Sequence, residues 1–255
     1  GGGTLELEKA NLSSDLFTFN AVWFSADTAD LKVFEDDSSI GFEATNLRSH
    51  IDLDDRIGLF YSNGISSFVQ FPENQYMCYI DALTWEIDSQ RISLGDTSNT
   101  LSSQSEFISL HKEQDSLSFF ANRASYNLKD YLISASGVGE IYLADAVIYP
   151  DSGLITIDKD AYIHPLRRSM IVVNESERPY KFFNSNIEIK AANQYNASGY
   201  YTYLGDSSNQ QTIFFNDIKV NKEGNTVGNA QIDSSLRIDD KHNFKGIISF
   251  SGGEK

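Results

Sequence analysis

The residues that could do acid–base or metal chemistry are scattered along the chain. The four histidines, His50, His111, His164 and His242, form no H-x-x-x-H or H-x-H pair, the spacings at which neighbouring histidines share a zinc ion. The acidic clusters are short and lie at Glu35-Asp36-Asp37, at Asp52, Asp54 and Asp55, and at Asp239-Asp240. The cluster at 52–55 lacks the glycine and the distal glutamate of the best calcium-binding loop. We therefore predict no metal site and no cofactor, and interpret the acids as solvated turns.

No nucleophile has the sequence context of a catalytic one. Cys78 lies between apolar neighbours in QYMCYIDAL, without an evident base, and is interpreted as a buried structural thiol. A G-x-S-x-G elbow, a phosphate-binding glycine loop and a dinucleotide fingerprint are all missing. Paired carboxylates for glycoside hydrolysis meet in space and not in sequence, so a carbohydrate-active enzyme stays an open third hypothesis. The sequence predicts no enzyme and no catalytic residue.

Aromatic residues are the remaining candidates for ligand binding. Tyr200, Tyr201 and Tyr203 lie close together on one expected strand, and Phe182-Phe183 and Phe214-Phe215 lie on two others. A row of rings on an exposed strand could stack on sugar rings or contact lipid, whereas on a covered face it belongs to the core. Because aromatics occur on both faces of these strands, the pattern favours core. The three tyrosines stay the candidates for a glycan site, and other ligand-binding residues are unknown.

The charge balance limits the classes of partner. With 20 basic and 36 acidic side chains, the formal charge is −16. This field repels nucleic acid and anionic membrane surfaces and tolerates neutral partners such as glycans. A single cysteine excludes an intramolecular disulfide. No apolar run is long enough to span a membrane, and we interpret the chain as a trimmed segment whose partners include further domains of the same or a longer chain.

The distribution of apolar residues predicts an all-β protein. Short runs rich in branched and aromatic residues alternate with Asn, Gly, Ser and Asp turns, and helical periodicity is nearly absent. The most polar stretch, 96–105, is predicted to be a loop. It would separate an N-terminal β region at 1–95 from a repeat-containing β region at 106–255, which we expect to be continuous with the first.

An internal repeat is expected in the second region. FANRASYN at 120–127 and LADAVIYP at 143–150 align with an offset of 23 positions, which predicts stacked layers. The alignment places the small residues Ala121, Ala124, Ala144 and Ala146 at inward bends, where a larger side chain would overpack the core. The predicted fold is an elongated stack of short β-layers, similar to a β-solenoid or jelly roll. A two-sheet β-sandwich is the alternative.

Two resemblances to known protein families suggest a cellular location and a role. The A-D-A strand, Y-P-D-S-G turn and I-T-I-D strand within 118–163 resemble the stacked layers of the lipopolysaccharide-transport, organic-solvent-tolerance-like family. Longer segments, among them SFVQFPENQYMCYIDALTWEID and YNASGYYTY, are similar to large uncharacterised envelope proteins of Gram-negative anaerobes. The resemblance implies a non-catalytic segment of a larger cell-envelope protein, periplasmic or at the cell surface. That segment would serve as a scaffold or a lipid-conducting groove, with a glycan-binding β module as the alternative.

Overall fold

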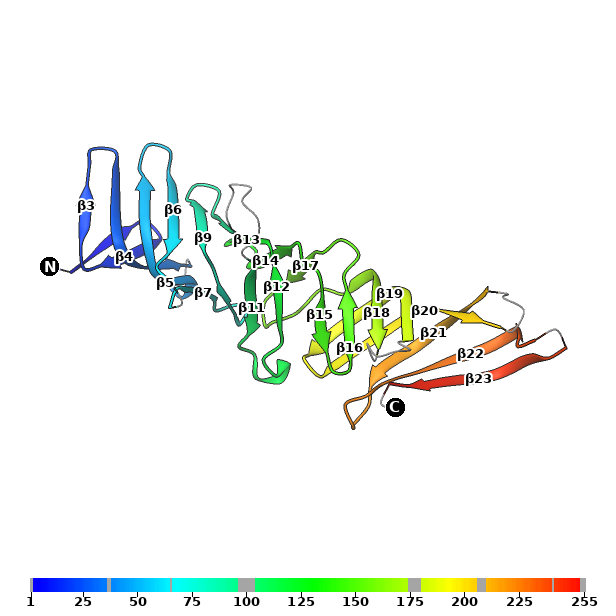
Figure 1. Ribbon diagram of the computed structural model, residues 1–255. Helices are drawn as coiled ribbons and strands as arrows, with labels where there is room; N and C mark the ends of the chain where they lie inside the picture. Colours follow the sequence, from blue (N-terminus) through cyan, green and yellow to red (C-terminus); the bar gives the residue numbers. More distant parts are fainter. Residues whose placement is uncertain are drawn as a thin grey trace. The chain divides into compact units, whose positions relative to one another are not determined.

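The protein is all-β, as predicted. A computed structural model describes residues 2–35, 38–64, 66–95, 104–173, 180–205, 210–239 and 241–252, which form twenty-three strands and one short 3-10 helix, η1 (Lys112–Gln114) (Figure 1). The strands make two antiparallel sheets, one of fifteen strands and one of eight. The two sheets agree with the alternative that the sequence offered, a two-sheet β fold. Residues 96–103 lie outside the described part of the chain, so the polar loop at 96–105 stays a prediction.

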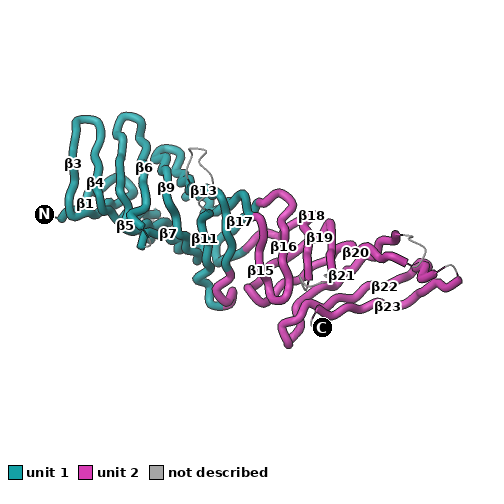
Figure 2. Tube along the Cα trace, viewed as in Figure 1, with its two compact units in different colours: residues 1–112, 118–138, 154–162 teal, residues 113–117, 139–153, 163–255 magenta. Residues whose placement is uncertain are grey.

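Contacts between residues group the chain into two compact units, coloured separately in Figure 2. The N-terminal unit comprises residues 1–112, 118–138 and 154–162, and the C-terminal unit comprises residues 113–117, 139–153 and 163–255. Each unit contains one of the two sheets. The chain passes between the units more than once, so neither is a single continuous segment.

The fifteen-stranded sheet belongs to the N-terminal unit. Its strands are β1 (Gly3–Leu7), β2 (Ala10–Ser14), β3 (Phe17–Phe19), β4 (Trp23–Phe34), β5 (Ile40–Asp52), β6 (Ile57–Ser62), β7 (Phe68–Phe71), β8 (Tyr76–Tyr79), β9 (Ala82–Glu86), β10 (Arg91–Leu94), β11 (Ser105–Ser109), β12 (Ser118–Ala121), β13 (Arg123–Asn127), β14 (Leu132–Ser136) and β17 (Ile155–Ile157).

The long strand β5 divides this sheet into two arms. Its residues 43–45 pair with β7, which leads to β8, β11 and β12, whereas its residues 47–52 pair with β6, which leads to β9, β10, β13, β14 and β17. Asn46 lies between the two pairings with a φ of 56°. Asparagine tolerates this left-handed conformation, and such a residue lets a strand change partner. The two arms can therefore diverge and enclose a core.

Aromatic rings fill the space between the arms. Phe71 of β7 meets Tyr126 of β13 edge to face, with ring centroids 4.8 Å apart, and Phe107 stacks on Phe119 at 5.4 Å. The Tyr126 hydroxyl donates a hydrogen bond to the Gly41 carbonyl at 3.0 Å. Edge-to-face and offset pairs of this kind are favourable beyond the area they bury. This core holds the two arms face to face.

The second arm contains a structural repeat of stacked hairpin turns. The turns β5–β6, β9–β10 and β13–β14 each end on a left-handed residue, Arg56, Gln90 and Tyr131, with φ of 54°, 55° and 54°. The Ile87 N–H donates to the Arg56 carbonyl at 3.1 Å, and the Leu128 N–H donates to the Gln90 carbonyl at 3.0 Å. Each turn is thus bonded to the one before it, which gives a repeat of hairpins along the sheet.

The repeat predicted from the sequence is wrong. Residues 120–127 form β12 and β13 in the fifteen-stranded sheet, where these two strands do not pair with each other, whereas residues 143–150 form a hairpin in the other sheet. Ala121, Ala124 and Ala146 are buried, but Ala144 is exposed in the turn with a φ of 51°. The expectation that a larger residue at Ala144 would overpack the core is therefore also wrong.

The eight-stranded sheet belongs to the C-terminal unit and is a meander. Its strands in spatial order are β15 (Ile141–Leu143), β16 (Ala146–Tyr149), β18 (Leu166–Val173), β19 (Tyr180–Ala191), β20 (Gln194–Leu204), β21 (Gln210–Val220), β22 (Thr226–Arg237) and β23 (Asn243–Ser251).

This sheet curls so that strands far apart in its order touch across its concave side. Phe250 of β23 lies 4.8 Å from Phe182 of β19, ring centroid to ring centroid, and Phe215 of β21 contacts both rings. At one end Asp145, in the β15–β16 turn, accepts hydrogen bonds from the backbone N–H and the hydroxyl of Thr226 at the start of β22. The sheet is thereby held as a half-barrel around its own core.

Candidate functional site

The residues that could do acid–base or metal chemistry stay apart in the structure. Among the described residues no group of three His, Cys, Asp or Glu side chains could hold a metal ion. His50 packs against the Trp23 ring at 5.2 Å, and His242 pairs with Asp239 at 2.8 Å across the β22–β23 turn. The hydrogen bond from His242 lowers the pKa of Asp239, whose side chain is partly exposed. Asp36, Asp37 and Asp240 lie outside the described residues.

The predicted solvated turn and the predicted structural thiol both occur. The Asp52 carboxylate accepts hydrogen bonds from the backbone N–H groups of Asp54 and Asp55, which stabilises the β5–β6 turn. Cys78 is fully buried in β8, and burial raises the pKa of its thiol. A raised pKa keeps the sulfur protonated and unreactive, as expected of a packing residue.

The aromatic strands of the eight-stranded sheet present two different faces. On the concave face, Phe182, Tyr201 and Phe215 contact one another with ring centroids 5.3 to 6.4 Å apart. Tyr195 is also buried there, and its hydroxyl lies 2.8 Å from the Thr226 hydroxyl. Phe182, Phe215 and Tyr195 are core and Tyr201 packs against them half-buried, as predicted, but the same prediction of core is wrong for Phe183 and Phe214, which are exposed. Of the three tyrosines considered for a glycan site, Tyr201 belongs to this cluster. Tyr203 lies two residues further along β20 and pairs with Gln211, so it points to the same concave face as Tyr201.

The opposite face carries a row of large side chains across five neighbouring strands, of which Met170, Phe183 and Phe214 are exposed and Tyr149 and Tyr200 are half-buried. We call it the aromatic band; it consists of Tyr149 (β16), Met170 (β18), Phe183 (β19), Tyr200 (β20) and Phe214 (β21).

Strand register builds the band. Tyr149 pairs with Met170, Phe183 pairs with Tyr200, and Tyr200 pairs with Phe214, so the side chains within each pair point to the same side of the sheet. Met170 lies at an irregularity of the β18–β19 pairing, but the next residue of β18, Ile171, pairs with the buried Phe182, so Met170 and Phe183 both point away from the core. Neighbouring strands lie about 4.8 Å apart, so five strands give a row about 19 Å long.

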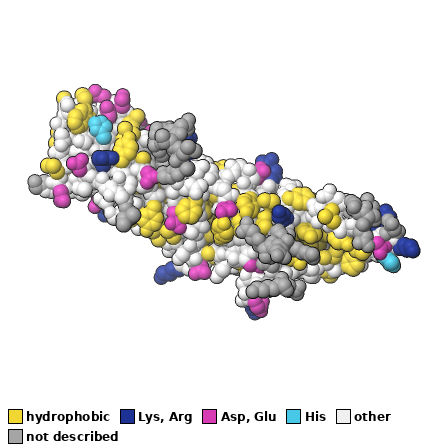
Figure 3. Space-filling model, viewed as in Figure 1, with side chains coloured by type: hydrophobic (Ala, Val, Ile, Leu, Met, Phe, Trp, Pro, Cys, Tyr) yellow, Lys and Arg dark blue, Asp and Glu magenta, His cyan; other side chains and the backbone are white. Residues whose placement is uncertain are grey.

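Three rings of the band, Phe183, Tyr200 and Phe214, are in contact, and the two phenylalanines are open to solvent. Phe183 and Tyr200 stack with centroids 6.0 Å apart, and Tyr200 lies 4.9 Å from Phe214. Phe183 and Phe214 are 41% and 46% exposed, and Met170 is 37% exposed. Figure 3 shows that hydrophobic side chains gather at the surface over the eight-stranded sheet. A contiguous exposed apolar row is unusual for a soluble surface and indicates a binding surface.

Sequence reasoning considered these rings but did not separate the two faces. Within each Phe-Phe pair, one ring enters the core and the other reaches solvent, because successive side chains on a strand alternate. The sequence contains no sign of which member of the pair faces out. Which ring faces out depends on the register between strands. Tyr149 and Met170 lie beside these rings only because of the fold, and the sequence alone does not place them there.

Comparisons with protein-family models, with curated proteins and with solved structures find no match. The resemblance to lipopolysaccharide-transport proteins and to large envelope proteins therefore stays a prediction. Within the described ranges, no helix has the length and hydrophobicity needed to cross a membrane.

Proposed function

We propose that this chain is a non-catalytic β module that binds a neutral glycan along the aromatic band. The observation that carries the proposal is the contact of Phe183, Tyr200 and Phe214 in one exposed, in-register row. The faces of sugar rings that carry C–H groups pack on aromatic rings, and a row of rings on a rigid sheet holds them without ordering flexible side chains. A linear glycan chain would lie across the strands, along the row.

Polar groups beside the band fit the hydroxyls of a sugar. Lys181 precedes Phe183 by two residues, and Thr202 follows Tyr200 by two residues, so both point to the same side as the rings. Thr202 pairs with Thr212 of β21, which adds a second hydroxyl. These groups can donate to and accept from sugar hydroxyls along one margin of the row.

The negative net charge of the chain favours uncharged glycans over anionic ones. At a formal charge of −16, a polyanionic polysaccharide would be repelled, whereas an uncharged one would not. The same argument disfavours an anionic lipid surface as the occupant of the band. We therefore infer that the ligand is a neutral polysaccharide.

A lipid-conducting groove receives less support. Such a groove needs an open apolar channel between sheets, but Phe182, Ile187 and Phe215 on the concave face of the eight-stranded sheet are buried. In the N-terminal unit, Phe71, Phe107 and Tyr126 likewise fill the space between the arms. The cell-envelope setting and a periplasmic or surface location are proposals that rest on the sequence resemblance alone.

Affinity electrophoresis and calorimetry against a panel of soluble neutral polysaccharides test this function. We expect the double substitution Phe183→Ala with Phe214→Ala to weaken binding at least tenfold, because stacking is lost at both sides of Tyr200. The matched control is Ile247→Ala, which removes a 66% exposed apolar residue from β23 of the same sheet, outside the band. Absence of binding to every polysaccharide, or equal loss in the control, would refute the proposal.

A further inference from the structure

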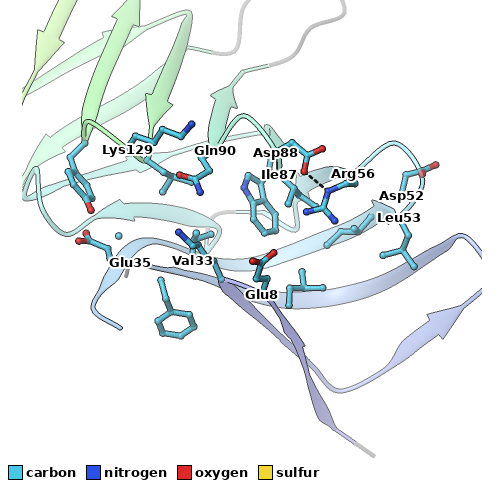
Figure 4. A pocket seen from close by; sticks show the side chains of 18 residues that line it. Glu8, Val33, Glu35, Asp52, Leu53, Arg56, Ile87, Asp88, Gln90 and Lys129 are labelled. Carbon is cyan, nitrogen blue, oxygen red and sulfur yellow. Dashed lines mark hydrogen bonds and ion pairs between the residues drawn. The ribbon is translucent and has the colours of Figure 1, made fainter. Parts of the chain in front are cut away.

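The pocket of the N-terminal unit carries charges of both signs. It has a volume of about 450 Å³ and is lined by the β1–β2, β5–β6, β9–β10 and β13–β14 turns and by the end of β4 (Figure 4). Its charged lining includes Glu8, Glu35, Asp88, Lys9, Arg56 and Lys129. Arg56 is paired with Asp88. These charges point to no particular class of ligand, in contrast to the free edge of the eight-stranded sheet.

Within the part of the chain that the structure describes, β23 is the longest strand at the end of either sheet. It has nine residues, whereas the other terminal strands, β1, β3, β12, β15 and β17, have three to five. Among the described residues it pairs with β22 alone (Figure 1). Because backbone N–H and C=O groups of an antiparallel strand point alternately to its two sides, half of those in β23 face outward. A partner strand can bond to them.

The sequence of β23 lacks most of the features that protect an exposed edge. Charged side chains, prolines and bulges usually keep a free strand from pairing with other chains. Although the chain has 36 acidic side chains, β23 has none, and Lys245 is its single charged residue. The strand contains no proline, and at the irregularity of the β22–β23 pairing the extra residues lie in β22, between Ile232 and Leu236. This edge is therefore suited to pairing.

Ile247, the central residue of β23, is open to solvent. Burial alternates along the strand, and Ile247 lies on the convex face, opposite to the face of Phe250, which contacts the core. Ile247 is 66% exposed, and its partner in β22 is the exposed Gln231. Removing a large apolar side chain from water is favourable, so this position favours an apolar contact from outside the sheet.

We propose that β23 pairs antiparallel with β23 of a second copy of this chain, about a two-fold axis that passes beside Ile247. A two-fold axis uses the same surface on both copies, and this one places Ile247 opposite Ile247 of the second copy. Lys245 then lies opposite Ser249 of the second copy, so no like charges meet directly. The strand is thus complementary to itself at its most exposed positions.

The concave side of the strand fits the same register. Phe244 lies opposite Phe250 of the second copy, and aromatic pairs across strands are favourable. Gly246, the one residue of β23 with a positive φ, lies opposite Ile248 and leaves room for it. Nine residue pairs make roughly nine backbone hydrogen bonds, within the range of about 5 to 15 that stable interfaces carry.

The pairing joins two eight-stranded sheets edge to edge. Its two-fold axis is perpendicular to the strands and to the joined sheet, so the convex faces of both copies, with their aromatic bands, lie on the same side. Each band is complete within one copy, on strands β16 to β21. Glycan binding and the pairing of β23 can therefore fail independently, and the pairing is measured without polysaccharide.

Sedimentation equilibrium of the full chain tests the pairing, and we expect a monomer–dimer equilibrium. Ile247→Lys and Ile247→Glu should each weaken dimerisation at least tenfold, because two like charges then meet at the axis. An equimolar mixture of the two variants should dimerise again, since lysine then faces glutamate. Leu204→Lys, at a 69% exposed position at the end of β20, is the control and should leave the dimer intact. A parent that is monomeric at every concentration, species larger than a dimer, or a mixture that stays monomeric would overturn the proposal.

Cysteine cross-linking tests the register. Ile247→Cys should form a disulfide between two copies on mild oxidation, because directly opposite residues have Cα atoms about 4.5 to 5.5 Å apart, within the range of a disulfide. Ser249→Cys should not, because the two copies of this position are offset by four residues along the strands, about 13 Å. The native Cys78 is buried and does not compete. Equal cross-linking of the two variants, or none of Ile247→Cys, would show that β23 does not pair in this register and would overturn the proposal.

Discussion

Asp145 holds two distant parts of the eight-stranded sheet together. It lies in the β15–β16 turn, and one of its carboxylate oxygens accepts two hydrogen bonds from Thr226, 81 residues further along the chain. Thr226 is fully buried and also contacts the Tyr195 hydroxyl. In the A-D-A motif, the sequence analysis singled out the two alanines. In the structure, the aspartate between them makes the hydrogen bonds that link the two parts of the sheet.

Replacing Asp145 should therefore cost much of the stability of this unit. We expect Asp145→Ala to lower the free energy of unfolding by about 3 kcal/mol, since hydrogen bonds to charged groups contribute about 1.5 to 3 kcal/mol each. Asp217→Ala serves as the control, because that exposed carboxylate only pairs with Lys219 at 2.8 Å and should change stability by less than about 0.5 kcal/mol. Urea unfolding monitors both. Equal midpoints for the two variants would mean that the Thr226 bonds contribute nothing net.

At the scale of elements, the sequence predicted the strands well and their partners poorly. The all-β class follows from alternation and turn residues, which are local, and it is confirmed. The proposed repeat aligned identical residue types at 120–127 and 143–150. Ala121 and Ala144 nevertheless have different surroundings, because strand pairing depends on partners far along the chain. The turns that do repeat share a left-handed residue at Arg56, Gln90 and Tyr131 and a degenerate sequence pattern, an acid or amide followed by Leu or Ile at 52–53, 86–87 and 127–128.

The same limit applies to the sites. Phe183 and Phe214 could be selected as aromatic candidates, but their exposure could not be predicted without the register of β19 to β21. Glu35 belonged to an acidic cluster that was interpreted as a solvated turn. Its Oε1 atom is buried beside Gly41 because the chain folds back from β4 into β5 there, where a side chain on Gly41 would lie 3.3 Å from this oxygen.

One side chain of the β7–β8 turn adds direct hydrogen bonds between the two arms. Asn74 is fully buried, and its Nδ2 donates to the carbonyls of Tyr131 at 2.6 Å and Ile157 at 3.2 Å, both in the second arm. An amide can make both bonds because it carries two donor hydrogens, and a carboxylate can make neither.

Substitutions at Asn74 should distinguish the effect of losing its hydrogen-bond donor from the effect of changing the size of its side chain. We expect Asn74→Ala to destabilise the N-terminal unit by about 2 kcal/mol, and Asn74→Asp to destabilise it more, although aspartate has nearly the same shape, because a buried charge would face two carbonyl oxygens. Asn216→Ala, exposed on β21, is the control. Guanidinium unfolding provides the measurement; an Asn74→Asp variant as stable as Asn74→Ala would show that this side chain does not act as a donor.

At the scale of the whole molecule, both units bury tyrosine hydroxyls. Burial raises the pKa of Tyr76 and Tyr126 in the N-terminal unit and of Tyr195 in the C-terminal unit above the ordinary value of 10.0. The nearby Glu35 carboxylate raises the pKa of Tyr126 further. In each case the folded protein keeps the proton at a pH where the unfolded chain loses it.

These raised pKa values make the stability of the fold decrease as the pH rises. A group whose pKa is raised by folding contributes its full stability below the unfolded pKa, and that contribution falls as the pH rises above it. Above about pH 10, each buried tyrosine should therefore reduce the free energy of unfolding by about 1.4 kcal/mol per pH unit. Burial also raises the pKa of Tyr201 in the C-terminal unit, so each unit contains two such tyrosines and both units should lose stability above pH 10.

Single Tyr→Phe substitutions test this expectation unit by unit. Tyr126→Phe removes one titrating group and the hydrogen bond to the Gly41 carbonyl, so it should lower stability at pH 8 and yet flatten the decline between pH 10 and 11.5. Tyr195→Phe should flatten only the decline of the C-terminal unit. Denaturant unfolding at a series of pH values, followed by tyrosine absorbance at 295 nm, measures both effects. If the slope of Tyr126→Phe equals that of the parent, the Tyr126 hydroxyl titrates in the folded protein as it does in the unfolded chain, and its burial does not govern the alkaline limit.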